Sequence, residues 1–127
     1  MQPIALQFGK DSSLLESRGA ILETTGLTVV NAHSVGQCTR ELLSRSFDLI
    51  VLCHSASMEE REQISTFVHQ RSPSTPVLLI SMFHETDQGV DAVVDCEPET
   101  LVDAIKTILS HHSTKPSRPP ISLARKP

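Results

Sequence analysis

The residues of this chain best suited to metal or redox chemistry are its three cysteines and six histidines. Cys53 and His54 end one short apolar run, and His84 and Cys96 follow the next two runs. Two thiolates and two imidazoles are ligands that suit Zn²⁺, and an activated thiol at position 53 would react with oxidants. The spacing contains no Cys-x-x-Cys pair and matches no zinc finger. We therefore interpret Cys53 and Cys96 as small buried apolar residues. We expect no metal and no cofactor, and keep a metal- or redox-sensing role for this pair as the alternative.

Cys53 also lacks the surroundings of a phosphatase nucleophile. Such a loop places an arginine six residues after the cysteine, where this chain has Glu59. The nearby acids Glu60 and Glu62 would raise a thiol pKa, and they fit the first turn of a helix better. No glycine-rich phosphate loop, HExxH or GxSxG motif occurs. We predict that the protein is not an enzyme and has no small-molecule substrate.

The composition is that of a soluble globular domain, with 39% hydrophobic and 20% charged residues. Four phenylalanines, without tyrosine or tryptophan, leave few rings on which bases could stack, so we expect no nucleic-acid partner for the body of the chain. No apolar run approaches the roughly 18 residues that span a bilayer. Residues 1–10 lack the basic and apolar regions of a signal peptide. We therefore expect a cytoplasmic protein without a membrane partner.

Charge divides the chain into a body and a tail. Residues 1–109 hold all of the 15 acidic residues, whereas residues 110–127 hold four basic residues, four prolines and no acid. A segment this poor in large apolar groups cannot offset its ordering entropy. We predict one domain over residues 1–109 and a disordered basic tail over 110–127, for which contact with an anionic partner stays open.

Short apolar runs alternate with segments of helical period in the predicted domain. Several of the runs are rich in Val and Ile, as expected for strands buried in a parallel sheet. Ser13, Ser34 and Ser57, each followed three residues later by Glu or Gln, predict capped helix starts. Gly26 and Pro98 predict one helix end and one helix start. The pattern predicts a five-stranded parallel sheet with helices on both faces. The runs are Ile4–Phe8, Leu27–Val30, Leu49–Leu52, Val77–Ile80 and Val90–Val94.

Three local motifs resemble one known family. The segments 47–52 (FDLIVL), 75–81 (TPVLLIS) and 89–92 (GVDA) are similar, in this order and spacing, to the third, fourth and fifth strands of receiver domains. The chain therefore resembles, over residues 3–109, the CheY-like receiver domain of bacterial response regulators in two-component systems. The resemblance implies a flavodoxin-like α/β fold with strand order 2-1-3-4-5.

The departures from this family fall on the phosphotransfer pocket. The two Mg²⁺-binding acids correspond to Gly9 and Lys10, with Asp11 one residue late, and the phosphoacceptor Asp corresponds to Cys53. Of the pocket only Ser81 is kept, because the family's Lys corresponds to Cys96. A phosphoryl group needs a nucleophile and a cation, so we expect no aspartyl phosphorylation.

A deletion follows the fourth strand. Only 15 positions separate Ser81 from Cys96, fewer than receivers ordinarily use, so we expect the family's fourth helix to be shortened or missing. Val90, Val93 or Val94 would then be partly bare, unless the loop covers them, and Val93 corresponds to the family's switch aromatic. Bare apolar surface at a sheet edge marks a contact site. The sequence therefore predicts a non-catalytic pseudo-receiver that signals in trans by protein–protein interaction, with a protein partner or as a homodimer.

Overall fold

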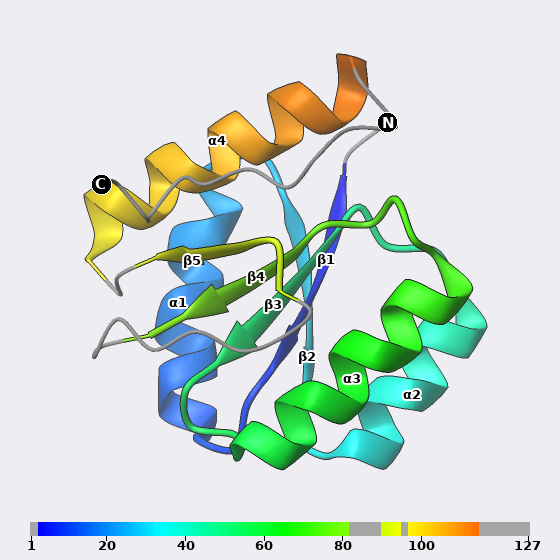
Figure 1. The fold of residues 1–127 in the computed structure, drawn as a ribbon. Helices are drawn as coiled ribbons and strands as arrows, with labels where there is room; N and C mark the ends of the chain where they lie inside the picture. The colour runs from blue at the N-terminus through cyan, green and yellow to red at the C-terminus, as the bar shows by residue number, and fades with distance from the viewer. Residues whose placement is uncertain (1–2, 82–89, 95–96, 115–127) are drawn as a thin grey trace.

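The computed structural model describes residues 3–81, 90–94 and 97–114, with side chains up to residue 110. Strands and helices alternate along the chain up to β4, as the periodicity predicts (Figure 1). The strands are β1 (Ile4–Phe8), β2 (Thr28–Ala32), β3 (Leu49–Cys53), β4 (Val77–Ile80) and β5 (Ala92–Val94). The helices are α1 (Ser12–Glu23), α2 (Val35–Ser44), α3 (Met58–Arg71) and α4 (Pro98–Thr114).

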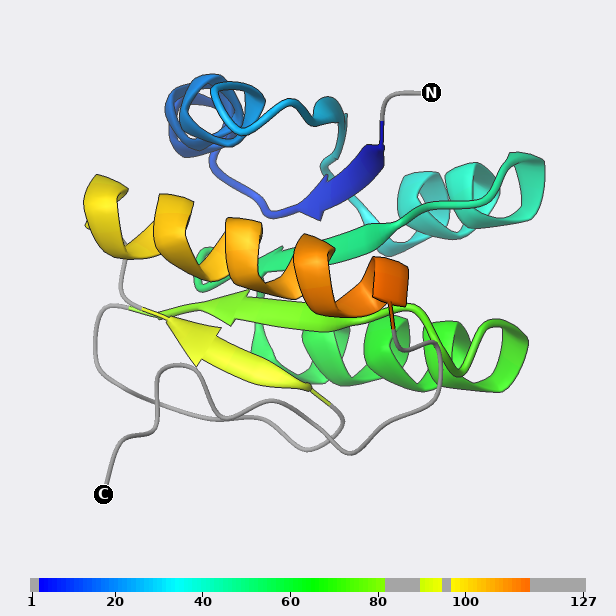
Figure 2. The same cartoon turned by 90° about the horizontal axis from the view of Figure 1, so that it is seen from above.

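All five strands are parallel and lie in the order β2-β1-β3-β4-β5. Helices α1 and α4 cover one face of the sheet, and α2 and α3 cover the other (Figures 1 and 2). A separate apolar cluster lies on each face of the sheet, one beneath α1 and α4 and one beneath α2 and α3. The expected flavodoxin-like architecture is confirmed.

Two aspartates in the receiver-like motifs join the starts of neighbouring strands. Asp48, just before β3, accepts a hydrogen bond from Ile4 N at Oδ2 (2.9 Å). Asp91, just before β5, accepts one from Val77 N at Oδ2 (2.7 Å). Each carboxylate satisfies the first N–H of the adjacent strand and so helps to fix the register of the sheet.

The helix caps confirm one predicted capping box and correct another. Ser57 and Glu60 form the box at the start of α3, each accepting from the backbone N–H of the other. Ser34 caps α2 by accepting from Gln37 N. Helix α1 begins earlier than predicted, because Asp11 Oδ1, not the hydroxyl of Ser13, accepts from the first free N–H groups.

The predicted boundaries shift at two places. Helix α4 continues to Thr114, so it includes residues that the sequence analysis assigned to the tail. Gly26 adopts a φ of +95° and its N–H bonds to Glu23 O, which agrees with its predicted place after α1. The rest of the predicted tail (115–127) and the predicted loss of a fourth helix (82–89) lie outside the described residues. Within the described part of the chain, no helix is long and apolar enough to cross a membrane.

Candidate functional site

The counterpart of the receiver pocket lies where β1, β3 and β4 end. Cys53 is the last residue of β3, Gly9 follows β1, and Ser81 follows β4. Gly9 and Cys53 are brought together, because a Cβ atom added at Gly9 would lie 3.0 Å from Cys53 Cβ. Ser81 is buried and its N–H donates to Val94 O (2.9 Å). Of the other predicted pocket residues, Lys10 and Asp11 follow Gly9 in the turn after β1, and Cys96 lies outside the described residues.

The side chain of Ser55 packs closely against Gly9. A Cβ atom at Gly9 would lie 2.8 Å from Ser55 Oγ, closer than such atoms approach in proteins. The same Oγ accepts hydrogen bonds from Lys10 N (3.0 Å) and Asp11 N (3.4 Å). The hydroxyl of Ser55 therefore joins the turn after β1 to the turn after β3, and any side chain at position 9 would require Ser55 to shift.

Lys10 does not place its charge in the pocket. Its Nζ lies 2.9 Å from Glu60 Oε2, in the first turn of α3, and its side chain is 44% exposed. The ammonium group of Lys10, together with the Ser57 backbone, lowers the pKa of Glu60 below its usual value. The ammonium group of Lys10 therefore has an exposed carboxylate partner at the start of α3.

Asp11 is also engaged elsewhere. Its Oδ1 accepts from Ser13 N (3.0 Å) and Leu14 N (3.2 Å) as the N-cap of α1. Its carboxylate is exposed and serves the helix start rather than the interior. No group of three or more His, Cys, Asp or Glu side chains that could hold a metal ion occurs among the described residues.

Cys53 is a buried free thiol in a polar surrounding. The residue is fully buried, and its Sγ donates to Gln7 Oε1 (3.5 Å). Gln7 is itself buried in the middle of β1, and its Nε2 donates to Leu15 O (3.0 Å) and Asn31 Oδ1 (2.9 Å). Burial raises the pKa of the Cys53 thiol, against a smaller lowering by the nearby guanidinium of Arg18. The thiol is therefore protonated at neutral pH.

Arg18 is the site residue that sequence reasoning missed. It lies on the inner face of α1, is 5% exposed, and its Nη1 has no hydrogen-bond partner. No carboxylate pairs with it in the part of the chain that the structure describes. The signal was present in the sequence: an arginine stands within the apolar stripe that includes Leu15 and Leu22. A buried guanidinium group therefore lies near the Cys53 thiol and opposes the rise of its pKa.

The predicted contact face is corrected at one residue. Val94 is 2% exposed and belongs to the cluster beneath α1 and α4, because successive residues of a strand point to opposite faces. Val90 and Val93 are half-buried and pack against the cluster on the other face, beneath α2 and α3. Nearby, His69 Nε2 of α3 lies 3.8 Å from Asp91 Oδ2. The candidate contact face therefore consists of Val90 and Val93, with polar groups of α3 beside it.

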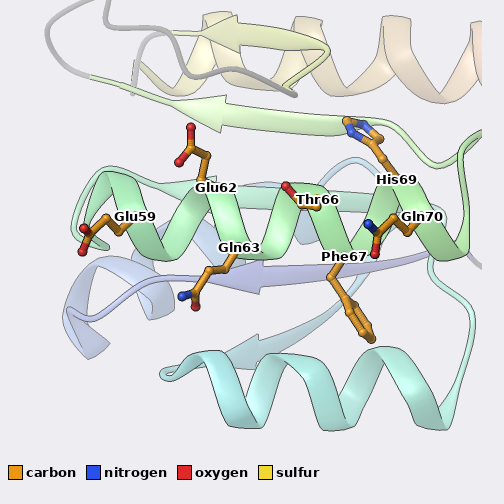
Figure 3. Close-up of a pocket in the computed structure, with 7 residues that line it drawn as sticks. All are labelled: Glu59, Glu62, Gln63, Thr66, Phe67, His69 and Gln70. Carbon is orange, nitrogen blue, oxygen red and sulfur yellow. The ribbon is translucent and has the colours of Figure 1, made fainter.

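An open cavity of about 760 Å³ runs along the outer side of α3. Its described lining comes entirely from this helix (Figure 3). Glu62, Thr66 and His69 point toward β4, whereas Gln63 and Phe67 point toward α2 (Figure 3). Polar side chains dominate this lining, and none of the residues matched to the receiver pocket contributes to it.

Comparison with known proteins supports the fold. No protein-family model matches the sequence, and no curated protein matches it. The signal receiver domain of an HD domain-containing protein from Pseudomonas fluorescens Pf-5 superposes with a TM-score of 0.78 at 20% identity, over 91% of this chain and 100% of that one. A CheY-like receiver domain protein from Methanospirillum hungatei JF-1 gives 0.77 at 20% identity, over 91% and 99%. The chemotaxis response regulator CheY4 of Vibrio cholerae gives 0.72 at 17% identity, over 85% and 99%. At these identities the similarity establishes a shared receiver fold.

Proposed function

We propose that this protein is a receiver-like signalling module that has lost phosphotransfer and acts by contact with another protein. The receiver fold supports the general role. The loss of phosphotransfer rests on the side chains at the ends of β1 and β3. The alternative, a sensor built on Cys53 and Cys96, would require Cys53 to become accessible.

One observation carries the loss of chemistry. Phosphoryl transfer to a receiver needs a carboxylate nucleophile and a carboxylate-held Mg²⁺ ion. A buried thiol, Cys53, stands at the position that corresponds to the nucleophile, and Gly9, at a position that corresponds to a Mg²⁺-binding acid, has no side chain and packs against Ser55. Lys10 and Asp11 are held by Glu60 and by the start of α1. The charge that remains beside Cys53 is the positive charge of Arg18.

The partner-contact role rests on the edge of the sheet. β5 is an edge strand of three residues, and its Val93 is half-buried on the α3 side. Among the described residues no strand pairs with the outer edge of β5, and a strand edge with apolar side chains and a polar rim is typical of many protein interfaces. Val90 and Val93 supply the apolar part, while Asp91 and His69 supply the rim.

Treatment with acetyl phosphate and Mg²⁺ tests the loss of phosphotransfer. We expect intact-protein mass spectrometry to show no added phosphoryl group, under conditions that label a receiver carrying all its acids. An increase in the mass of the intact chain by one phosphoryl group, whether or not acid removes that group, would overturn the proposal.

Native mass spectrometry of the reduced protein tests the contact role. We expect the purified protein to form a dimer, or the protein isolated from cells that make it to form a complex with a partner protein. In both cases the mass of its own subunit should equal that of the bare polypeptide. Val93→Lys should abolish that assembly, because the interface would then bury the lysine charge without an opposite charge to pair with it, which costs free energy. Val30→Lys is the matched control, since Val30 is also half-buried on the same face but lies on β2 at the other edge. Assembly that survives Val93→Lys, or added mass that denaturation removes from a monomer, would contradict the proposal, the latter in favour of the sensor.

A further inference from the structure

The outer edge of β5 offers backbone groups to a further strand. β5 is the last strand of the sheet, and in the part of the chain that the structure describes no strand pairs with its outer edge. Val94 O accepts a hydrogen bond from Ser81 N (2.9 Å), so it faces β4. The backbone groups of successive strand residues point to the two edges in turn, so the N–H and C=O of Val93 face outward. A further strand can therefore pair with Val93 through two hydrogen bonds.

The side chains at this edge are apolar in the middle and acidic at both ends. Val93 is half-buried on the side of α3, and the side chain of Asp91 is 31% exposed. The segment 91–95 reads DAVVD and contains no basic residue. Direct antiparallel pairing of two copies about Val93 would place position 91 of each opposite position 95 of the other, and like charges directly opposite are destabilising. The edge therefore favours a strand with an apolar residue opposite Val93 and a basic residue two positions further on.

The tail that follows α4 contains a segment with this pattern. Residues 115–127 hold four of the 11 basic residues and no acid, whereas residues 1–109 hold the other 7 and all of the 15 acids, a net charge of −8. The four prolines of the tail exclude most of it from a paired strand. They leave the stretch 121–126, which reads ISLARK. Leu123 and Arg125 stand two positions apart in it, so in a strand their side chains lie on one face.

We propose that residues 121–126 of one copy pair antiparallel with β5 of a second copy, with Leu123 opposite Val93 and Arg125 opposite Asp91. The outward N–H and C=O of Val93 bond to Leu123, and the opposite charges lie on the side of α3. Exchange of the two tails is reciprocal, as in closed two-fold dimers. This inference rests on the proposed contact role and identifies its partner as a second copy of this chain.

The position of α4 disfavours antiparallel pairing within one chain. Helix α4 follows the carboxyl end of β5 and runs back over the sheet, so it ends on the side where the strands begin (Figures 1 and 2). Its 17 residues make it about 25 Å long. To pair with its own β5, the tail would have to return over most of this length, cross from the helix layer to the sheet, and reverse its direction. The seven steps from Thr114 to Ile121 span only about 25 Å when fully extended.

Parallel pairing within one chain is disfavoured by the handedness of the crossover. Helices α1 and α4 lie on the same face of the sheet, but α1 leads from β1 toward the β2 edge, whereas α4 would lead toward the β5 edge. The two crossovers would therefore have opposite hands. Nearly all parallel crossovers are right-handed, so a sixth strand of this kind is excluded beside a right-handed β1–α1–β2 unit.

Pairing between two copies avoids both difficulties. In a two-fold dimer the two β5 strands run in opposite directions, so the carboxyl end of the second β5 lies level with the end of the first α4. The tail then has to cross one layer and a few strand spacings, about 10 Å in each direction, before it runs antiparallel to that strand. Residues 115–120 span this distance with length to spare.

Sedimentation equilibrium and amide hydrogen exchange of the full-length, reduced protein test this pairing. We expect a dimer in which the Val93 amide exchanges slowly. Leu123→Pro removes the N–H that bonds to Val93, so it should raise the dimer dissociation constant at least about tenfold and make the Val93 amide exchange fast. Ser117→Pro is the matched control, because it adds a proline to the tail outside 121–126, and it should change neither quantity.

The register is tested by two neighbouring charges. Arg125→Gln should weaken the dimer about fivefold, because each dimer loses two pairs with Asp91. Lys126→Gln removes the same charge from the adjacent residue, which points to the other face of the strand, and should weaken the dimer less. Equal effects of the two substitutions would overturn the assigned register.

The other outcomes separate this inference from the proposed function. A dimer that persists in Leu123→Pro overturns tail exchange and leaves the contact role in place. A monomer whose Val93 amide is protected until Leu123→Pro is introduced overturns exchange in favour of pairing within one chain. A complex with a different protein in place of the dimer overturns the second copy as the partner, and the contact role again survives. A monomer with a rapidly exchanging Val93 amide also overturns the inference.

Discussion

Lys10 Nζ lies 2.9 Å from Glu60 Oε2 and so joins the turn after β1 to the first turn of α3. The turn after β1 corresponds to the Mg²⁺-binding turn of receiver domains. In this chain an exposed ion pair links that turn to α3. Glu60 also closes the capping box with Ser57, so one carboxylate serves both the helix start and the link between two loops.

This pair predicts a change in the titration of Glu60. The side chain of Lys10, followed by the Ser57 backbone, lowers the pKa of Glu60, so Lys10→Gln should raise that pKa toward its usual value. A lowered pKa stabilises the fold above the ordinary pKa of the group, and that contribution is lost as pH falls through the folded value. Carboxyl ¹³C NMR of both proteins measures the shift. The unfolding free energy at neutral pH should fall by no more than about 1 kcal/mol, because the pair is exposed. An unchanged Glu60 pKa would show that the ion pair does not form in solution.

Close packing at the turn after β1 gives a second prediction. Gly9→Ala should destabilise the fold by about 1–3 kcal/mol, because its Cβ would meet Ser55 Oγ at 2.8 Å and Cys53 Cβ at 3.0 Å. Ser55→Ala alone should also destabilise the fold, since Lys10 N and Asp11 N lose their acceptor. The two changes should cost less together than their sum, because the second relieves the clash of the first. A urea-unfolding double-mutant cycle measures this coupling, with Gly36→Ala as control, since a Cβ there meets nothing within 4 Å. Strict additivity would contradict the packing account.

The buried thiols give a third prediction, on reactivity and alkaline stability. Burial raises the pKa of Cys38 to about 12 from the model-compound value of 9.0, which lowers its thiolate fraction about a thousandfold at neutral pH. Burial also raises the pKa of Cys53. Both thiols should therefore resist iodoacetamide in the native protein and react in urea, as peptide mass spectrometry can show. The unfolding free energy should decline as pH rises from about 9 toward 12, because the unfolded chain then loses protons that the folded chain keeps. Rapid native labelling of Cys53 would favour the sensor over the contact module.

The fold could be predicted largely because local signals agreed with one another. Apolar runs with turn residues between them located all five strands, and the resemblance to receiver domains implied their order. In the structure Asp48 and Asp91 each accept a hydrogen bond from the first N–H of a neighbouring strand, which explains why an aspartate stands just before β3 and β5. Residues at strand ends were less certain, and Leu27 and Val90 lie just outside the strands to which they were assigned.

The pocket was predicted by position but not by contact. The resemblance to receiver domains placed Gly9 and Cys53 at the carboxyl-terminal end of the sheet, and in the structure a Cβ atom added at Gly9 would lie 3.0 Å from Cys53 Cβ. Sequence spacing could not show that Ser55 would bond to two N–H groups more than 40 residues away, since that depends on how two turns approach each other. Nor could spacing show which of Asp11 and Ser13 caps α1, because both residue types are good N-caps. The choice depends on which side-chain oxygen lies within hydrogen-bond distance of the free N–H groups at the start of the helix.

Arg18 provides the last prediction, on the cost of a buried cation. Its Nη1 has no hydrogen-bond partner and no carboxylate compensates it in the described part of the chain, so its burial costs free energy. Arg18→Met, which keeps the length and removes the charge, should leave the unfolding free energy unchanged or raise it by about 1–2 kcal/mol. The Cys53 pKa should rise further, because the lowering influence of Arg18 is gone, and alkaline thiol labelling should slow accordingly.

Leu15→Met is the control for Arg18→Met, a substitution of similar volume on the same inner face of α1 that removes no charge. A loss of more than about 2 kcal/mol in Arg18→Met, beyond that of the control, would mean that the contacts of Arg18 with the polar groups around Cys53 outweigh its desolvation. The predicted result has the opposite meaning. If removal of Arg18 costs no stability, folding does not explain the buried cation beside Cys53, and Arg18 becomes the residue to examine for a role in the proposed signalling function.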